Sequence, residues 1–196
     1  MRIFFRFVLF SFLVVIFFSC VKKEENYTPK PRGYFRIELP EHSYRHLDTT
    51  LPFAFDYSKN AVLTYSKKEN GKYWIDITYP QFNASFNITY IPLDNNLRDL
   101  ALAEEKMIKF HVDYGKADDV EFSLIEDAES HLSGRLFDIA GKEVACPLQF
   151  WLTDSTNHYL RGALYFNFAP NNDSLQPVIN YLRTDALHLI NSFSWK

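Results

Sequence analysis

Cysteine is scarce in this chain of 196 residues, which contains only Cys20 and Cys146. Two cysteines cannot form a disulfide framework around a domain, so the fold depends on its hydrophobic core. Glycine is also scarce, with six residues, and there is no P-loop, dinucleotide-binding glycine pattern, G-x-S-x-G elbow or H-E-x-x-H motif. The sequence therefore carries no catalytic signature and implies no cofactor. A site assembled only in space would leave no such motif.

The chain also lacks a block of like charge. Arg2 and Arg6 lie in an N-terminal leader, and without them 19 basic residues face 24 acidic ones, a formal charge of −5. Nucleic acids and anionic lipid surfaces attract positive protein surfaces. The negative charge therefore argues against nucleic acids and anionic lipid surfaces as general partners. Attachment to a membrane would require a feature other than a basic surface.

The N-terminus contains such a feature, a candidate signal peptide followed by a cysteine. Arg2 and Arg6 precede an apolar run from residue 7 to residue 18, which is shorter than the roughly 20 residues of a spanning helix. Residues 1–19 are therefore interpreted as a secretory signal peptide. Cys20 follows Ser19 as in a bacterial lipobox, although Phe17 stands where leucine is commonest. We expect cleavage before Cys20 and its acylation; a plain signal peptide or an uncleaved anchor is the alternative.

The remaining sequence divides into two parts. Residues 20–33 hold the lipidated Cys20 and a polar tether, in which Pro29 and Pro31 favour an extended backbone. Residues 34–196 form a single globular domain of ordinary size.

Within the domain the pattern predicts strands, a helix, more strands and a second helix. Asn70-Gly71 predicts a hairpin, and the strict alternation of residues 83–90 predicts a half-buried antiparallel strand. The expected strands cover residues 34–39, 52–57, 61–66, 72–79, 83–90, 120–126, 131–139, 145–153 and 158–168. The last two of these are expected at the centre of the sheet.

Helical spacing predicts the two helices. The first runs from Leu97 to Tyr114, with Met107 and Phe110 expected in the core, and the second from Asp173 or Ser174 nearly to Lys196. The order predicts an α+β domain with an antiparallel sheet and two main helices packed on it. It resembles the Mog1/PsbP-like α/β/α sandwich, a likeness of fold that carries no function.

The candidate reactive residues have structural interpretations. His42 and His46 share an H-x-x-x-H spacing that suits zinc on a helix, but they lie in a predicted loop. Cys146 beside Pro147 is better explained as a small buried hydrophobic residue than as a nucleophile. Three Asp-Ser/Thr pairs resemble a short periplasmic O-glycosylation motif and also suit turns and caps. The sites that they would modify are Thr49, Ser155 and Ser174.

Large amphipathic side chains on the predicted central strands offer an interaction face. These are Trp151, Tyr159, Arg161 and Tyr165. The alternative is that the first helix covers them.

Several stretches together resemble the gliding-motility lipoprotein GldD family of Bacteroidota. They are PKPRGYFRIELP after Cys20, then LPFAFDY and WIDITYP, the block FWLTDSTNHYLRGALYFNFAP and the terminal SFSWK. The resemblance implies an envelope lipoprotein that the gliding motor and the associated type IX secretion apparatus need. It implies no enzymatic activity and transfers only Cys20 as a functional residue.

The residues and the resemblance agree on a lipid-anchored accessory or scaffold protein. Its expected partners are other envelope lipoproteins and gliding or secretion proteins. Its expected location is the periplasmic face of the outer membrane, with the inner membrane as the alternative. A periplasmic small-ligand-binding lipoprotein and an envelope hydrolase of unrecognised type are the competing hypotheses.

Overall fold

The computed structural model describes residues 37–47, 49–114 and 116–196. The chain divides into two compact units, Met1–Tyr34 and Phe35–Lys196, and the described residues belong to the second. The predicted signal peptide, Cys20 and the predicted tether lie outside the described residues. Within the described ranges, no helix is both long and apolar enough to cross a membrane.

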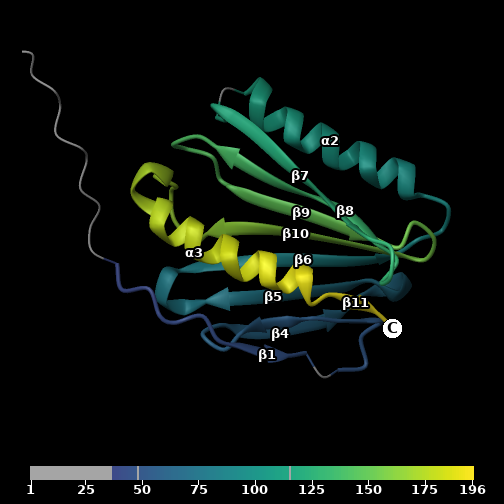
Figure 1. The fold of residues 1–196 in the computed structure, drawn as a ribbon. Coiled ribbons are helices and arrows are strands. Elements are labelled where there is room, and N and C mark those ends of the chain that lie inside the picture. Colours follow the sequence, from purple (N-terminus) through teal and green to yellow (C-terminus); the bar gives the residue numbers. More distant parts are fainter. Residues whose placement is uncertain (1–36, 48, 115) are drawn as a thin grey trace, which may run out of the picture. The chain divides into compact units, whose positions relative to one another are not determined.

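A seven-stranded sheet forms the centre of the domain, and every neighbouring pair is antiparallel (Figure 1). The predicted strands of this region are confirmed, with β10 in the central position. In spatial order the strands are β4 (Val62–Lys67), β5 (Tyr73–Tyr79), β6 (Ala84–Pro92), β10 (His158–Phe166), β9 (Leu148–Thr153), β8 (Leu132–Ala140) and β7 (Asp119–Asp127).

The predicted hairpin joins β4 to β5. Asn70 and Gly71 have φ angles of 58° and 72°, in a short 3-10 turn, η1 (Glu69–Gly71). Asparagine and glycine accept this left-handed backbone at low cost, which explains why the turn forms here.

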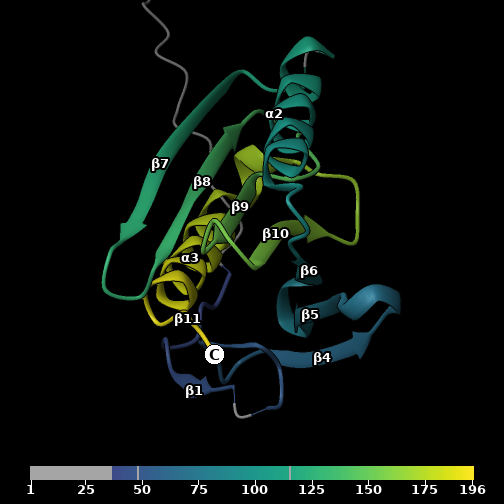
Figure 2. The same cartoon turned by 90° about the vertical axis from the view of Figure 1, so that its right-hand side faces the viewer.

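Two helices lie on opposite faces of the sheet (Figure 2). On one face, α3 (Asn172–Asn191) packs Leu182 and Leu189 into the core that holds Leu160 and Leu164 of β10. On the other, α2 (Leu97–Asp113) places Glu104 against Arg161, the residue after Leu160. Successive strand residues point to opposite faces, so the helices enclose the sheet from both sides. The predicted α+β fold class is confirmed.

The face that α2 buries differs from the prediction. Phe110 is 55 % exposed and Tyr114 69 % exposed, and their rings contact one another at 4.2 Å between centroids. Glu104 is buried instead, and Met107 and Ile108 are half-buried. The prediction was wrong for Phe110, because the inward face of α2 instead carries Glu104, paired with Arg161, and Ile108, packed on a small apolar cluster. Met107 does lie on this face, where it contacts Arg161.

The start of the domain also differs from the prediction. Residues 37–40 are not in a strand, and β1 (Tyr44–His46) forms within the predicted loop and pairs with β3 (Asp56–Ser58). Pro40 has no N–H to donate to a neighbouring strand, which disfavours a strand that reaches it.

The two ends of the domain meet. The second helix ends at Asn191, earlier than predicted, and β11 (Ser194–Trp195) then pairs with β2 (Phe53–Ala54). Ser192 directs its Oγ to the carbonyl of His188 at 2.9 Å and accepts the Asp56 N–H at 2.8 Å. Beyond it, the ring of Phe193 stacks on Phe53. The C-terminus is therefore fixed in the core.

Candidate functional site

A buried carboxylate joins the first described segment to the last helix. Asp185 of α3 is 4 % exposed. Its Oδ1 accepts hydrogen bonds from His42 Nδ1 at 2.7 Å and the Tyr44 hydroxyl at 3.0 Å, and its Oδ2 accepts one from the Tyr79 hydroxyl at 2.9 Å. We call these four residues, His42, Tyr44, Tyr79 and Asp185, the Asp185 clasp.

Ring stacking reinforces the clasp along α3. The His42 ring stacks on Tyr181 with centroids 4.2 Å apart, and the Tyr44 ring stacks on His188 at 3.5 Å. Tyr181 and His188 lie on α3 on either side of Asp185, so the segment before and within β1 follows the helix for about two turns. The chain is thus fastened to α3 close to where the predicted tether ends.

The electrostatics of the clasp keep its two tyrosine hydroxyls as hydrogen-bond donors. Burial, together with the neighbouring Asp185 carboxylate, raises the pKa of the Tyr44 and Tyr79 hydroxyls. Both hydroxyls therefore stay protonated and donate to Asp185. An Asp–His pair can serve a nucleophile as general base through its second ring nitrogen, Nε2. The Tyr44 hydroxyl instead lies 3.3 Å from His42 Nδ1, the nitrogen that also bonds Asp185, so Tyr44 is not placed as that nucleophile.

The two histidines of the H-x-x-x-H spacing, His42 and His46, bond to different partners in the structure. His42 enters the clasp, whereas His46 Nδ1 lies 2.8 Å from Asp56 Oδ1. Among the described residues, no group of three or more His, Cys, Asp or Glu side chains is placed to hold a metal ion. The sequence did not reveal the contact of His42 with Asp185, because the two residues are 143 positions apart.

The predicted interaction face lies under α2 over part of its area. Tyr159 is 1 % exposed, and Arg161 Nε lies 2.9 Å from Glu104 Oε1. Gln149 also donates to Glu104. Burial raises the pKa of Glu104, and Arg161 opposes that rise. The helix α2 therefore covers Tyr159 and Arg161, as in the alternative interpretation of this face.

The other two residues of that face are half-buried. They are Trp151 and Tyr165. Trp151 stacks on Tyr159 with ring centroids 6.1 Å apart. A contact between these two side chains and a partner stays a prediction.

Cys146 has the environment of a core residue. It is completely buried, and burial raises its pKa to about 12. A nucleophilic cysteine requires access and a lowered pKa. The interpretation as a small buried hydrophobic residue agrees with this environment.

The three predicted glycosylation sites lie at the surface. Ser155 is exposed in the β9–β10 turn with a φ of 66°, Ser174 is exposed in the first turn of α3, and Thr49 is half-buried. Each supports local structure; the Thr49 carbonyl, for instance, accepts a bond from Lys196 Nζ at 2.8 Å. Their modification stays a prediction.

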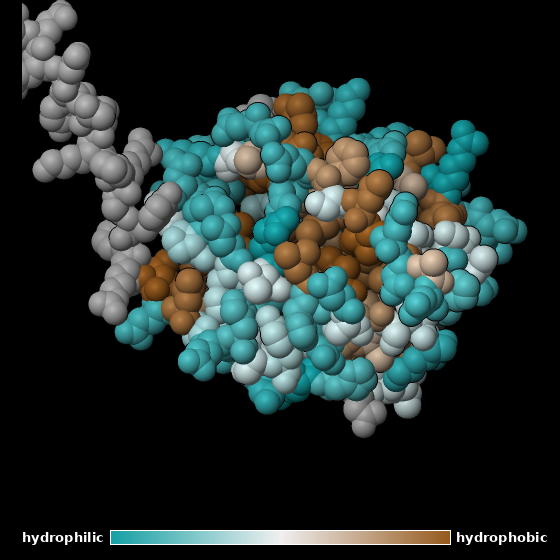
Figure 3. Space-filling view, viewed as in Figure 1, coloured by the Kyte–Doolittle hydropathy of each residue, from teal (hydrophilic) through white to brown (hydrophobic). Residues whose placement is uncertain are grey.

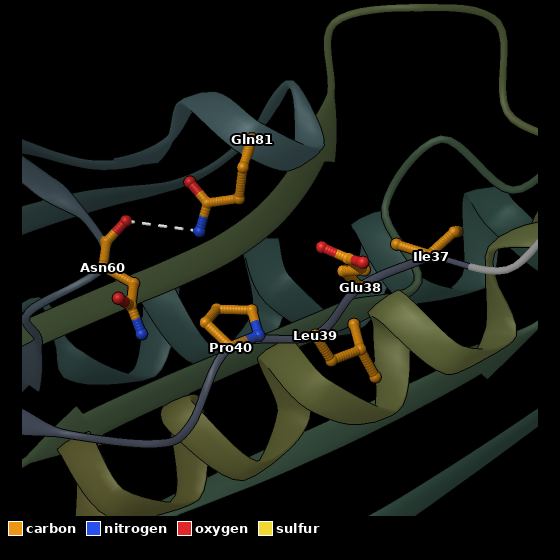
Figure 4. Close-up of a pocket in the computed structure, with 6 residues that line it drawn as sticks. All are labelled: Ile37, Glu38, Leu39, Pro40, Asn60 and Gln81. Carbon is orange, nitrogen blue, oxygen red and sulfur yellow. Dashed lines mark hydrogen bonds between the residues drawn. The ribbon is translucent and has the colours of Figure 1, made fainter.

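An open hollow of about 730 Å³ lies beside the clasp (Figure 4). Gln81 Nε2 bonds the Asn60 carbonyl at 3.3 Å on one side of it, and the Asn60 side chain donates to the Tyr181 hydroxyl at 3.3 Å. The hollow is lined by Ile37, Glu38, Leu39, Pro40, Asn60 and Gln81.

Comparisons with known proteins identify the family of this chain. No curated protein matches it. Among solved structures, the solution structure of cyanobacterial PsbP (CyanoP) from Synechocystis sp. PCC 6803 matches with 10 % identity and a TM-score of 0.45, over 81 % of this chain and 95 % of that one. The family model described as gliding motility lipoprotein GldD matches residues 24–195. The chain therefore belongs to the GldD family of gliding motility lipoproteins.

Proposed function

We propose that this protein is a non-enzymatic scaffold of the gliding machinery and of the associated type IX secretion system, anchored in the envelope by lipid on Cys20. The observation that carries the proposal is the family match, which begins four residues after Cys20 and continues to residue 195. Membership in a family of gliding motility lipoproteins makes it an envelope-anchored component of motility.

The clasp supports a role under mechanical tension. A protein held through its N-terminus passes any pull to the start of the described domain, where His42 and Tyr44 lie. Two hydrogen bonds from this segment to the buried Asp185 carboxylate, together with the stacking of His42 on Tyr181 and of Tyr44 on His188, resist such a pull more than a single exposed contact would. The segment is therefore suited to hold a domain at the end of a tether.

The environments of Cys146 and Asp185 support the non-enzymatic part. Cys146 is buried with a raised pKa, and the clasp carboxylate is fully occupied by donors. The acyl chains of Cys20 would place the domain at the periplasmic face of the outer membrane, or alternatively at the inner membrane, since two or more chains give stable attachment.

Crosslinking in living cells tests this proposal. Cells expressing the native chain or Cys20→Ala are crosslinked, and the protein is purified under denaturing conditions. We expect gliding and secretion proteins of the envelope to copurify with the native chain, and their recovery to fall by about tenfold with Cys20→Ala, because a chain without the acyl groups loses the local concentration that lipid anchoring provides. Equal recovery from both, or recovery of none, would contradict the anchored scaffold.

Small-ligand binding is the second candidate, favoured by the hollow of about 730 Å³ and its convergent polar groups from Glu38, Asn60 and Gln81. Native mass spectrometry of the purified protein distinguishes the two functions. A stoichiometric bound small molecule that Asn60→Trp displaces would favour the ligand binder, and a mass equal to that of the bare chain would favour the scaffold.

A further inference from the structure

The edge strand β7 is unusually open. It is nine residues long and lies at the end of the sheet order, and in the described part of the chain only β8 pairs with it. Figure 2 shows β7 at the margin of the sheet. Natural proteins usually keep edge strands short, covered or marked with lysine, because their free backbone groups pair with other chains. Residues 119–127 contain no lysine, arginine or proline.

Half of the β7 backbone points outward. In an antiparallel pair only alternate residues bond to the neighbouring strand. The Val120 N–H donates to its neighbour Asp119 Oδ1 at 2.9 Å, which places Val120 in the outward set. By alternation Phe122, Leu124 and Glu126 belong to the same set. An added strand would therefore meet a row of outward N–H and C=O groups on Phe122, Leu124 and Glu126, while the Val120 N–H is already bonded to Asp119.

Apolar side chains stand beside this row. Phe122 is 57 % exposed and Leu124 is 62 % exposed, on the face of the sheet that carries α2. The opposite face of β7 borders a hollow of about 300 Å³ between the strand and α3, where apolar side chains gather (Figure 3). Its apolar lining includes Ile125, Leu132, Leu187 and Ile190.

An added strand would direct alternate side chains to these two faces. One set would contact Phe122 and Leu124, and the other would reach the hollow beside α3. This is the arrangement of β-strand addition, in which backbone bonds give affinity and pockets for alternate side chains give specificity.

Both ends of β7 are acidic and exposed, whereas its centre is apolar. The nearest arginine in the facing strand, Arg135, lies over the Phe122 ring at 5.2 Å and faces Glu105 at 3.8 Å. Arg183 of α3 pairs with Asp138 and also interacts with Glu121, so the charge of the first end comes mainly from Asp118 and Asp119. The acidic residues are Asp118, Asp119 and Glu121 at one end and Glu126, Asp127 and Glu129 at the other.

From this juxtaposition we propose that β7 binds an extended segment of an envelope partner as an eighth strand, and that this segment has an apolar centre and lysine or arginine at both ends. The inference rests on the proposed scaffold function, because it names the surface through which the scaffold holds a partner. Opposite charges placed across a strand pair stabilise it, which fixes the basic ends of the segment.

A second copy of this chain fits the edge less well. Two β7 strands paired around a two-fold axis would place acidic ends opposite one another, which is unfavourable. The other sheet edge, β4, is partly occupied, since the Arg45 guanidinium donates to the carbonyls of Lys59 and Ala61 at its start, at 3.2 and 3.1 Å.

Site-specific photocrosslinking in cells tests the proposal. A benzoyl-phenylalanine replaces Phe122 in the full chain, and a matched control replaces Trp74 of β5, which is 54 % exposed on the same face of the sheet but away from β7. Mass spectrometry then identifies the crosslinked peptide. We expect one envelope protein from position 122, through a peptide with apolar residues between lysines or arginines, and not from position 74.

A proline variant tests the backbone bonds. Leu124→Pro removes an outward N–H and leaves the bonds to β8 in place, whereas Leu124→Ala removes only the side chain. We expect Leu124→Pro to lower the crosslink yield from position 122 by about tenfold, and Leu124→Ala by clearly less. Circular dichroism and Tm confirm that both variants fold.

Three results would overturn the proposal. They are a crosslink from position 122 to a second copy, one to an acidic segment, and no position-specific crosslink from folded protein. If such a result appears while native chains still copurify with motility proteins in a Cys20-dependent manner, the β7 assignment fails and the scaffold function stands. If copurification fails as well, the scaffold function fails with it.

Discussion

Replacement of Asp185 with alanine is expected to lower the free energy of unfolding by about 3 kcal/mol. Asp185 is 4 % exposed, and its carboxylate accepts hydrogen bonds from His42, Tyr44 and Tyr79. Without it the buried Tyr79 hydroxyl loses its acceptor, which carries the main cost. Water can replace the acceptor for His42, because its side chain is 35 % exposed.

Urea denaturation of the mature chain measures this effect, and the melting temperature should fall by roughly 10 °C for a domain of this size. Asp185→Asn keeps one carbonyl acceptor and should cost only about 1 kcal/mol. The control Gln176→Ala, which removes an exposed bond to Asn180 on the same helix, should change stability by less than about 0.5 kcal/mol. A loss for Asp185→Ala no larger than that of the control would contradict the clasp.

Replacement of Arg161 with alanine is expected to destabilise the domain by about 3 kcal/mol at neutral pH. Arg161 Nε faces Glu104 Oε1 at 2.9 Å beneath α2, and Glu104 is 4 % exposed. The variant leaves a buried carboxylate without its cation. The exposed pair Arg135–Glu105, at 3.8 Å, supplies the control, and Arg135→Ala should cost less than about 1 kcal/mol.

The loss in Arg161→Ala should depend on pH. Burial raises the pKa of Glu104 in the folded protein above its ordinary value of 4.5, so the folded state binds this proton more tightly than the unfolded state. The contribution of Glu104 to stability is therefore greatest below 4.5 and declines as the pH rises through the folded pKa. Removing Arg161 raises that pKa further, and the decline extends to higher pH.

Denaturation at several pH values between 5 and 8 checks this sign. The difference between the native chain and Arg161→Ala should shrink as the pH falls, because a neutral Glu104 needs no cation. The double variant Arg161→Met with Glu104→Gln should recover much of the loss, since a buried ion pair is often replaceable by uncharged residues. A constant difference across the range would show that Arg161 acts through packing alone.

The parts of the fold predicted correctly have strong local patterns. The alternation in β6, the Asn70-Gly71 turn and the apolar stripe of α3 each depend on residues that are neighbours in sequence. The order of strands and helices then restricts the architecture to few arrangements.

The parts predicted wrongly depend on distant partners. The strand at β1 is determined by Tyr44, whose partner Asp185 is 141 residues away, and the early end of α3 depends on Ser192 bonding Asp56 across the domain. On α2, Glu104 is buried against Arg161. A buried acid looks like a surface residue in sequence, so the apolar stripe with Phe110 received the core position by mistake.

For the candidate site too, the sequence identified individual residues but not their distant partners. The sequence singled out His42 and Arg161 by residue type, yet the acid partner of each lies on a helix that neither motif nor spacing connects to it. The edge strand β7 was predicted as a strand, but its exposure follows only from the order of strands in the sheet.

The most direct test of the central claim is gliding by cells that lack the native protein and express either the native chain or Cys20→Ala. The account predicts that Cys20→Ala accumulates as a folded domain with an unchanged melting temperature, yet restores neither gliding nor secretion. Full restoration by Cys20→Ala at native protein levels would contradict the account, because it would show that the domain acts without its lipid anchor.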